Sequence, residues 1–202
     1  MPFLVIRYSA IGGDVVAGKK DDRRVEFTKM MLRRSLAALM RSKPIGKITI
    51  KEICEKAELN RGTFYAHFAD QSDLLRHTED VAMEQLSGYV LDITAADAEE
   101  RERVCAEMFR HIRDNSDMWG SLLSENGNAD FSKRMFETLF ADLAEAGHCK
   151  ADDSCARLAF TYAMVGCVGM ASYWLHGEPE VSPGQMGKIL ANSIGSKLFI
   201  EE

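Results

Sequence analysis

Residues 48–76 read ITIKEICEKAELNRGTFYAHFADQSDLLR, and this stretch decides the fold. Thr49 and Glu52 have the T-x-x-E spacing of a capping box, in which each side chain bonds the other residue's backbone N–H. A short helix is therefore predicted to begin after Thr49. Steps of three and four residues place one apolar stripe on its inner face. The stripe consists of Ile50, Ile53, Cys54 and Ala57.

A tight turn at Glu58 and Leu59 is predicted to follow that helix. Asn60 is a good N-cap for a second helix that begins at Arg61, because its side-chain oxygen can accept a free backbone N–H. A third, longer helix is expected from Gln71. The whole segment therefore predicts two short helices joined by a turn and followed by a longer helix.

The second helix separates an inner face from an outer face. Phe64 and Phe68 point inward, and the outward residues are Arg61, Gly62, Thr63, Tyr65 and His67. The Arg61 guanidinium can bind the O6 and N7 acceptors of guanine. Gly62 has no Cβ and allows a close approach to the groove, and Thr63 suits a phosphate or a thymine methyl group.

The remaining outward side chains suit phosphate oxygens. Tyr65 and His67 can bind phosphates, which fix the position of a protein on DNA without reading its sequence. Helix N-termini near Asn60 and Asp70 add backbone N–H groups and positive dipole ends. An ordinary surface helix is the alternative, but the combined spacing favours nucleic acid. The predicted DNA contacts are Thr49, Lys51, Asn60, Arg61, Gly62, Thr63, Tyr65, His67 and Gln71.

The segment resembles the DNA-binding domain of the TetR family of bacterial transcription regulators. The matching residues are Gly62-Thr63-Phe64-Tyr65, His67-Phe68 and Leu74-Leu75. Upstream, the residues similar to the family's first helix are Arg23-Arg24, Thr28-Lys29, Leu32, Leu36, Leu39 and Met40. The resemblance covers about residues 22–80. It implies a helix-turn-helix domain that binds double-stranded DNA.

Two positions depart from the family pattern. Glu58 stands where the family usually has glycine, and a side chain in the left-handed conformation costs about 1 kcal/mol relative to glycine. Gln71 stands where the family usually has a lysine that contacts phosphate. Losing this charge is expected to weaken DNA binding and to reduce the salt dependence by about one unit of slope.

Charge is distributed unevenly along the chain. The protein has 25 Lys or Arg and 31 Asp or Glu, a formal net charge of −6. Residues 19–77 hold 14 basic and 8 acidic side chains, a net of +6, whereas residues 78–202 hold 10 and 22, a net of −12. Only the first of these regions is expected to approach DNA favourably.

Composition predicts an all-α protein. The resemblance implies that it has an N-terminal helix-turn-helix domain and a helical C-terminal domain for ligand binding and dimerisation. A chain of 202 residues with only four prolines can form long uninterrupted helices. Residues 1–21 are predicted to be a flexible extension, residues 22–77 the DNA-binding domain and residues 78–202 the C-terminal domain. The expected later helices are 71–93, 97–115, 117–125, 129–146, 152–176 and 183–200.

The N-terminal extension holds few interpretable features. Gly12-Gly13 and the lack of a persistent period indicate flexibility. The basic residues Lys19, Lys20, Arg23 and Arg24 are interpreted as a solvated charge run. An arm that reaches into a minor groove is the alternative.

The C-terminal region supplies large side chains that could surround a small apolar ligand. The candidate ligand contacts are Phe109, Trp119, Phe136 and Phe140. Plain core packing is the alternative for each of them, because aromatic stripes at helical spacing are usually core. The family resemblance implies a small-molecule effector in this domain.

The segment 156–175 is apolar nearly all round and contains the small residues Gly166 and Gly169. Burying it within one subunit would be difficult, so a symmetric dimer is expected. The resemblance implies pairing through the last two helices, about 152–176 and 183–200. The end of this segment also resembles the branch that includes the dihydroxyacetone kinase operon activator.

Several other classes of protein are disfavoured. No stretch approaches the roughly 20 apolar residues of a membrane span and no export signal is evident, so a cytoplasmic protein without membrane contact is expected. The odd number of cysteines, five, without a C-x-x-C pair indicates reduced thiols. No metal-ligand set, cofactor motif or nucleophile with an adjacent base stands out, so neither a metal nor a cofactor is expected.

Together these features predict a ligand-responsive homodimeric repressor that binds a palindromic operator. An activator of the same fold, controlled by a protein coactivator, is the alternative, and the Gln71 departure is compatible with it. A helical enzyme is a more distant alternative.

Overall fold

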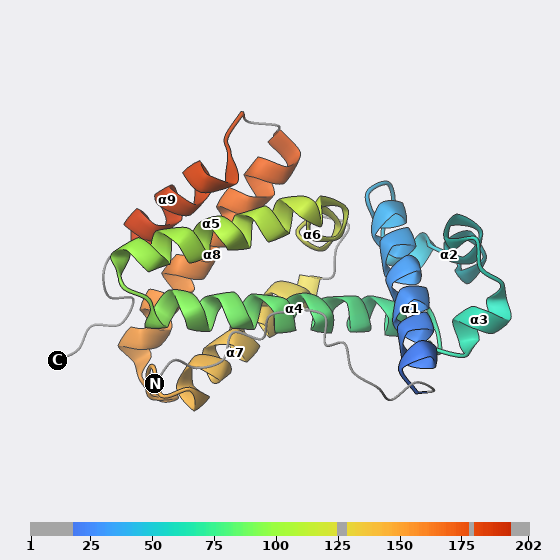
Figure 1. Cartoon of the computed structure of the whole chain (residues 1–202), viewed down its shortest axis with the longest axis horizontal. Helices are drawn as coiled ribbons and strands as arrows, with labels where there is room; N and C mark the ends of the chain where they lie inside the picture. The colour runs from blue at the N-terminus through green and yellow to red at the C-terminus, as the bar shows by residue number, and fades with distance from the viewer. Residues whose placement is uncertain (1–17, 125–128, 178–179, 195–202) are drawn as a thin grey trace.

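The computed structural model describes residues 18–124, 129–177 and 180–194, and these residues are helical without any strand. The all-α prediction is confirmed. The helices are α1 Gly18–Met40, α2 Ile50–Ala57, α3 Arg61–Tyr65, α4 Gln71–Ala95, α5 Ala98–Asp114, α6 Ser116–Leu122, α7 Ala129–Glu145, α8 Ser154–Gly177 and α9 Pro183–Ile194, with a short 3-10 turn at Ile45–Lys47. Helices α1 to α3 lie at one end of α4, and α5 to α9 lie along its remainder (Figure 1).

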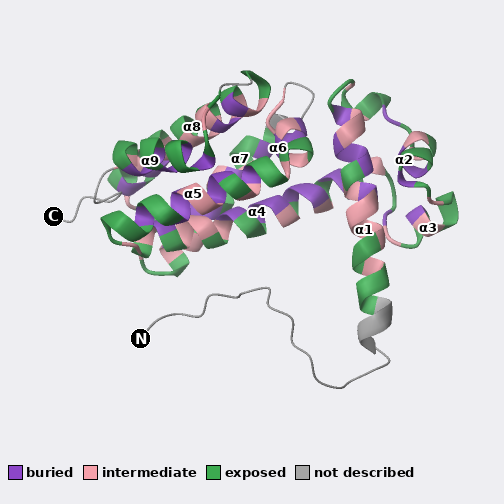
Figure 2. Cartoon of the chain, turned by 45° about the horizontal axis from the view of Figure 1, so that its top comes forward, coloured by how far each residue is buried: buried purple, intermediate pink, exposed green. Residues whose placement is uncertain are grey.

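The N-terminal domain is held together by one small apolar core. Leu32, Leu36 and Met40 of α1 are fully or almost fully buried, as are Ile53 of α2 and Phe64 of α3. Figure 2 shows this buried stripe on α1 facing α2 and α3, while the N-terminal turns of α1 project away from the other helices. Burying apolar surface stabilises the domain by about 25 cal/mol per Å².

Helix α4 joins the two domains. It runs without interruption from the domain of α1 to α3 into the C-terminal domain, across the boundary predicted at residue 77 (Figure 1). Arg134 of α7 contacts Glu79 and Asp80 of α4, each at 2.6 Å, and the Glu79 side chain is buried. A paired buried carboxylate fixes α7 against α4, because breaking such a pair leaves an uncompensated charge.

Helix ends agree closely with the sequence prediction, with two differences. Residues 18–21 belong to α1, so the predicted flexible extension is too long, and Lys19 and Lys20 lie on a helix rather than on an arm. Helix α3 ends at Tyr65, so His67 and Phe68 follow the helix. Residues 1–17 lie outside the described part, as do residues 195–202, which include the predicted end of the last helix.

Helix α8 differs from the expectation that no stretch of the chain is long and apolar enough to span a membrane. Its 24 residues meet that criterion by length and composition alone. One face of α8 packs in the C-terminal domain through residues such as Phe160, Met164 and Trp174. The opposite face is exposed and apolar. Its largest side chains are Leu158, Tyr162, Val165 and Tyr173, which are 60–73% exposed.

Candidate nucleic-acid interface and ligand cavity

The capping box at the start of α2 forms as predicted. The Thr49 backbone N–H donates to Glu52 Oε2 at 2.9 Å, and the Glu52 N–H donates to Thr49 Oγ1 at 3.3 Å. Lys43 contacts the other carboxylate oxygen of Glu52 at 2.5 Å. The hydrogen bond from Lys43, followed by those from Thr49, lowers the pKa of Glu52 to about 2. Thr49 therefore has a structural task in addition to its predicted contact with DNA.

The turn between α2 and α3 has the strained residue that the sequence predicts. Glu58 has φ 54° and ψ 37°, and it is the one non-glycine residue with positive φ in the described ranges. Its N–H and that of Leu59 bond carbonyl groups in the last turn of α2, including Cys54 O at 2.9 Å from Leu59 N. The turn therefore has the usual helix-ending geometry despite the missing glycine.

Asn60 fixes the start of α3. Its Oδ1 accepts the Thr63 N–H at 2.7 Å and the Thr63 hydroxyl at 3.1 Å. A Cβ on Gly62 would lie 3.1 Å from the same Oδ1, which is a tight contact. The glycine thus leaves room for the cap as well as for DNA. Asn60 and Thr63 hold the first turn of α3 in place, and their outer atoms face solvent.

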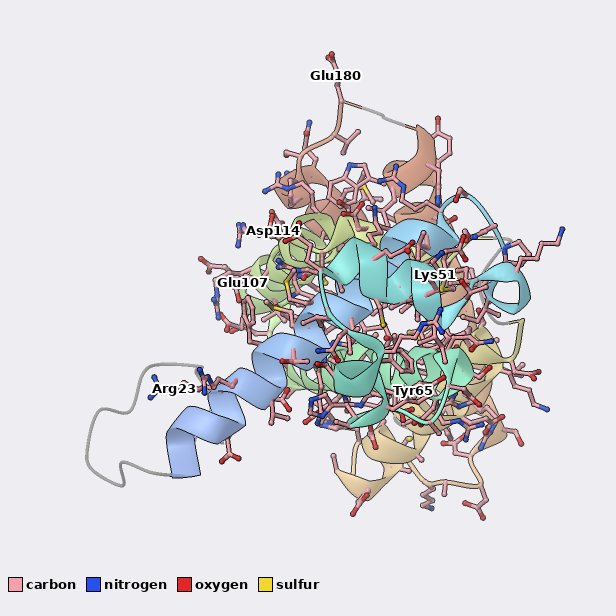
Figure 3. The ribbon with its side chains drawn as sticks, turned by 90° about the vertical axis from the view of Figure 1, so that its right-hand side faces the viewer. Arg23, Lys51, Tyr65, Glu107, Asp114 and Glu180 are labelled. Atoms are coloured by element: carbon pink, nitrogen blue, oxygen red, sulfur yellow. The ribbon has the colours of Figure 1, made fainter. Side chains whose placement is uncertain are left out.

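The outer face of α3 presents polar groups at one end of the molecule. Figure 3 views this end, with Lys51 on α2 and Tyr65 on α3 labelled. Arg61 and Gly62 are exposed, and Tyr65 is 58% exposed, while Phe64 between them is fully buried. Phe64 supports the Tyr65 ring edge-on, with 5.7 Å between the ring centroids. This buried base leaves more than half of the tyrosine side chain in solvent.

The predicted contacts outside α3 differ in accessibility. Lys51 is exposed and lies 3.6 Å from Glu55, so it is available at little cost because exposed pairs are weak. His67 and Gln71 are half-buried. The exposed basic side chains of the 3-10 turn, α2 and α3 are Lys47, Lys51, Lys56 and Arg61.

A second candidate site is a small cavity inside the C-terminal domain. It has a volume of about 60 Å³. Seventeen residues line it, from helices α4 to α9 and from the position directly after α6, and none of them is charged. Most of the lining is aliphatic or methionine, for example Val90, Met108, Met164 and Leu190. An apolar lining without charge suits an uncharged apolar ligand.

Only one of the four predicted ligand residues lines this cavity. Trp119 of α6 does so. Phe109 is fully buried and packs edge-on against Trp174, with the ring centroids 5.9 Å apart. Phe136 and Phe140 both pack on Phe160 from α7, and Phe160 rather than either of them reaches the cavity. These three side chains pack around the cavity without lining it, and Phe136 is only partly buried.

Two thiols lie near the cavity, Cys105 fully buried and the cavity residue Cys167 half-buried. Desolvation raises the pKa of both to about 12, so both are neutral thiols at physiological pH. Within the described residues, no group of three or more His, Cys, Asp or Glu is placed to hold a metal ion.

The fold and the polar outer face of α3 define a helix-turn-helix DNA-binding protein. Two family models match the chain. One, described as bacterial regulatory proteins of the tetR family, matches residues 34–78. The other, described as a transcriptional regulator C-terminal region of the same family, matches residues 99–196. The chain belongs to the TetR family of transcription regulators.

Solved structures show the same fold. A TetR regulator from Streptococcus agalactiae 2603V is 19% identical with a TM-score of 0.55, and the match covers 87% of this chain and 98% of that one. A tetR-family regulator from Streptomyces coelicolor is 15% identical with a TM-score of 0.60, covering 83% and 78%. The dihydroxyacetone kinase operon activator DhaS is 15% identical with a TM-score of 0.54, covering 84% and 94%. No curated protein matches.

At these identities the likeness is one of fold alone. DhaS resembles this chain no more closely than the other two regulators do. The predicted resemblance to its branch is therefore a resemblance to the family as a whole.

Proposed function

We propose that this regulator is a cytoplasmic homodimeric repressor that binds a palindromic operator through α2 and α3 and releases it when a small molecule enters the C-terminal domain. The outer face of α3 carries this proposal, because its exposed Arg61 and Tyr65 stand on a buried Phe64. Arg61 would contact base edges, and Lys51, Tyr65 and His67 would contact phosphates.

The exposed face of α8 supports the dimer. Leu158, Tyr162, Val165 and Tyr173 recur at helical spacing along one side, and isolated soluble proteins rarely expose such a continuous apolar strip. Gly166 and Gly169 lie on the same helix, and a Cβ added at either would meet no atom within 4 Å. Open space beside these glycines would let a second helix approach closely.

Fluorescence anisotropy on labelled DNA tests the operator proposal. The protein is titrated onto the intergenic DNA upstream of its own gene and onto a scrambled sequence, each across a salt series. We expect selective binding with a steep salt slope, and Arg61→Gln should reduce affinity and selectivity together. Glu26→Gln, an exposed change on α1, is the control. Equal binding to both sequences would reject the repressor proposal and favour an activator that needs a protein coactivator.

Sedimentation velocity tests the α8 dimer with two matched glycine substitutions. Gly166→Leu adds bulk on the proposed interface, whereas Gly88→Leu adds it on α4, where an added Cβ also meets nothing within 4 Å. Leucine is a better helix former than glycine by about 1 kcal/mol, so neither change should unfold the subunit. We expect Gly166→Leu to give monomers and Gly88→Leu to remain dimeric. Dimers in both variants would place the interface elsewhere.

A further inference from the structure

The cavity of the C-terminal domain has only three polar side chains in its lining. The hydroxyl proton of Thr94 is already used, because it donates to Val90 O at 2.8 Å. Burial raises the pKa of Cys167 to about 12, which leaves a neutral thiol with a weak donor. Trp119 is the third, and its indole N–H is the one strong donor among them.

The Trp119 indole N–H has no hydrogen-bond partner among the described residues, although the side chain is only 1% exposed. The other tryptophan behaves in the usual way, since Trp174 Nε1 donates to Val181 O at 2.9 Å. A buried donor without a partner costs free energy. A ligand that displaces the side chains covering the indole nitrogen and supplies an acceptor would recover it.

We infer that the cavity binds a small, uncharged, largely apolar molecule with one hydrogen-bond acceptor, such as a ketone or ether oxygen, which accepts the Trp119 N–H. This inference rests on the proposed effector response and specifies its ligand. Carboxylates, phosphates and ammonium groups are excluded, because no charged side chain lines the cavity and burying an unpaired charge is costly.

The size of the cavity links binding to movement. An apolar cavity of about 150 Å³ holds benzene, so about 60 Å³ is too small for a ring of that size. A larger ligand must displace part of the wall or project from the open side of the cavity, where Val168 and Ile194 are only half-buried. Trp119 lies on the seven-residue helix α6, whose Asp117 contacts Arg41, directly after α1, at 2.8 Å. A ligand on Trp119 thus acts on the helix that touches the DNA-binding domain.

Two neutral probes of nearly the same shape test the inference. Cyclohexanone has a carbonyl oxygen where methylenecyclohexane has a CH₂ group. Their affinities are measured for the wild-type protein and for Trp119→Phe by titration. In parallel, ¹⁵N-labelled tryptophan gives two indole N–H signals in NMR spectra, and Trp174→Phe leaves only that of Trp119.

We expect the ratio of ketone to alkene affinity to fall by about tenfold in Trp119→Phe, as the loss of one buried hydrogen bond implies. Only the ketone should shift the Trp119 indole proton downfield. An unchanged ratio, or an indole signal that does not move when the ketone is bound, would overturn the inference. Should Trp119→Phe fail to fold, the indole signal of the wild-type protein decides alone.

Charged analogues and operator binding separate the remaining outcomes. Cyclohexanecarboxylate and cyclohexylammonium should not bind, and binding of either would contradict the excluded classes. If neither neutral probe binds at concentrations up to its solubility limit, the inference is also overturned. These ligand-binding results do not affect the anisotropy measurement of operator binding. That measurement therefore tests the DNA-binding proposal separately.

Discussion

At the scale of single residues, Glu58 shows how the chain accommodates an unfavourable side chain at a turn. Its left-handed φ of 54° is the conformation that glycine adopts freely, and its N–H still completes the end of α2. We expect Glu58→Gly to raise the free energy of unfolding by about 1 kcal/mol. Urea denaturation measures this. Glu55→Gly, on the exposed side of α2, should instead lower it by a similar amount, and equal effects of the two changes would contradict the argument.

His77 is a second residue whose environment makes a prediction, here for pH. Arg33 Nη1 lies 3.3 Å from His77 Nε2, so this nitrogen must accept and the proton is on Nδ1. Burial and then the charges of Arg33 and Lys29 lower the pKa of His77. The unfolded chain thus binds a proton more readily than the folded one, so stability is complete above the ordinary histidine pKa and falls as the pH drops below it.

The measurement is urea denaturation of wild type and His77→Gln between pH 7 and pH 5. Glutamine can accept from Arg33 but does not titrate, so the variant should lose less stability on acidification. His111, whose pKa is also lowered by burial, should account for part of the remainder. Identical pH dependence of the two proteins would show that His77 is not acid-sensitive.

At the scale of helices, local capping signals were sufficient to predict most elements. The capping box at Thr49, the Asn60 cap and the break after Glu145 each act over a few residues, so their effect is visible in the sequence. The length of α3 was overestimated, because Phe68 is buried at helical spacing from Phe64 although the helix has already ended at Tyr65.

The cavity lining could not be predicted in the same way. Which side chains reach it depends on how six helices pack, and aromatic residues on the right helices can face the wrong neighbours. Phe109 is directed to Trp174, and Phe136 and Phe140 to Phe160. Trp119 was found by residue type, whereas its missing hydrogen-bond partner is visible only in the structure.

Packing between α5 and α9 makes a prediction at this scale. A Cβ on Gly187 would lie 2.4 Å from Ala106 N and 2.6 Å from its Cα, and backbone atoms of a helix cannot move away cheaply. Gly187→Ala should therefore lower the free energy of unfolding by at least about 1–3 kcal/mol, as overpacking does. Thermal unfolding tests this against Gly184→Ala on the same helix, where the nearest atom is 3.9 Å away. Matching melting temperatures for the two variants would refute it.

At the scale of the whole molecule, three features connect the domains. Helix α4 is continuous through both, α1 packs directly against α6, and Arg41, directly after α1, contacts Asp117 of α6 at 2.8 Å. Both side chains of this pair are more than 60% exposed, so the pair contributes little to stability. The pair matters for its position, because it links the DNA-binding domain to α6. Coupling between two sites is reciprocal, so if α6 influences operator binding, operator binding must influence α6.

Hydrogen exchange of α6 amides with and without operator DNA measures this coupling directly. We expect operator DNA to slow exchange in 116–122 in the wild-type protein, and Asp117→Asn to reduce that protection by up to about fivefold, the range of an exposed ion pair. Glu26→Gln is the matched control, since it breaks an exposed pair with Lys29 within α1 and changes net charge equally. Equal protection in all three proteins would mean that the Arg41–Asp117 pair does not carry the coupling, which would leave the packing of α1 on α6 and the continuous helix α4 as its routes.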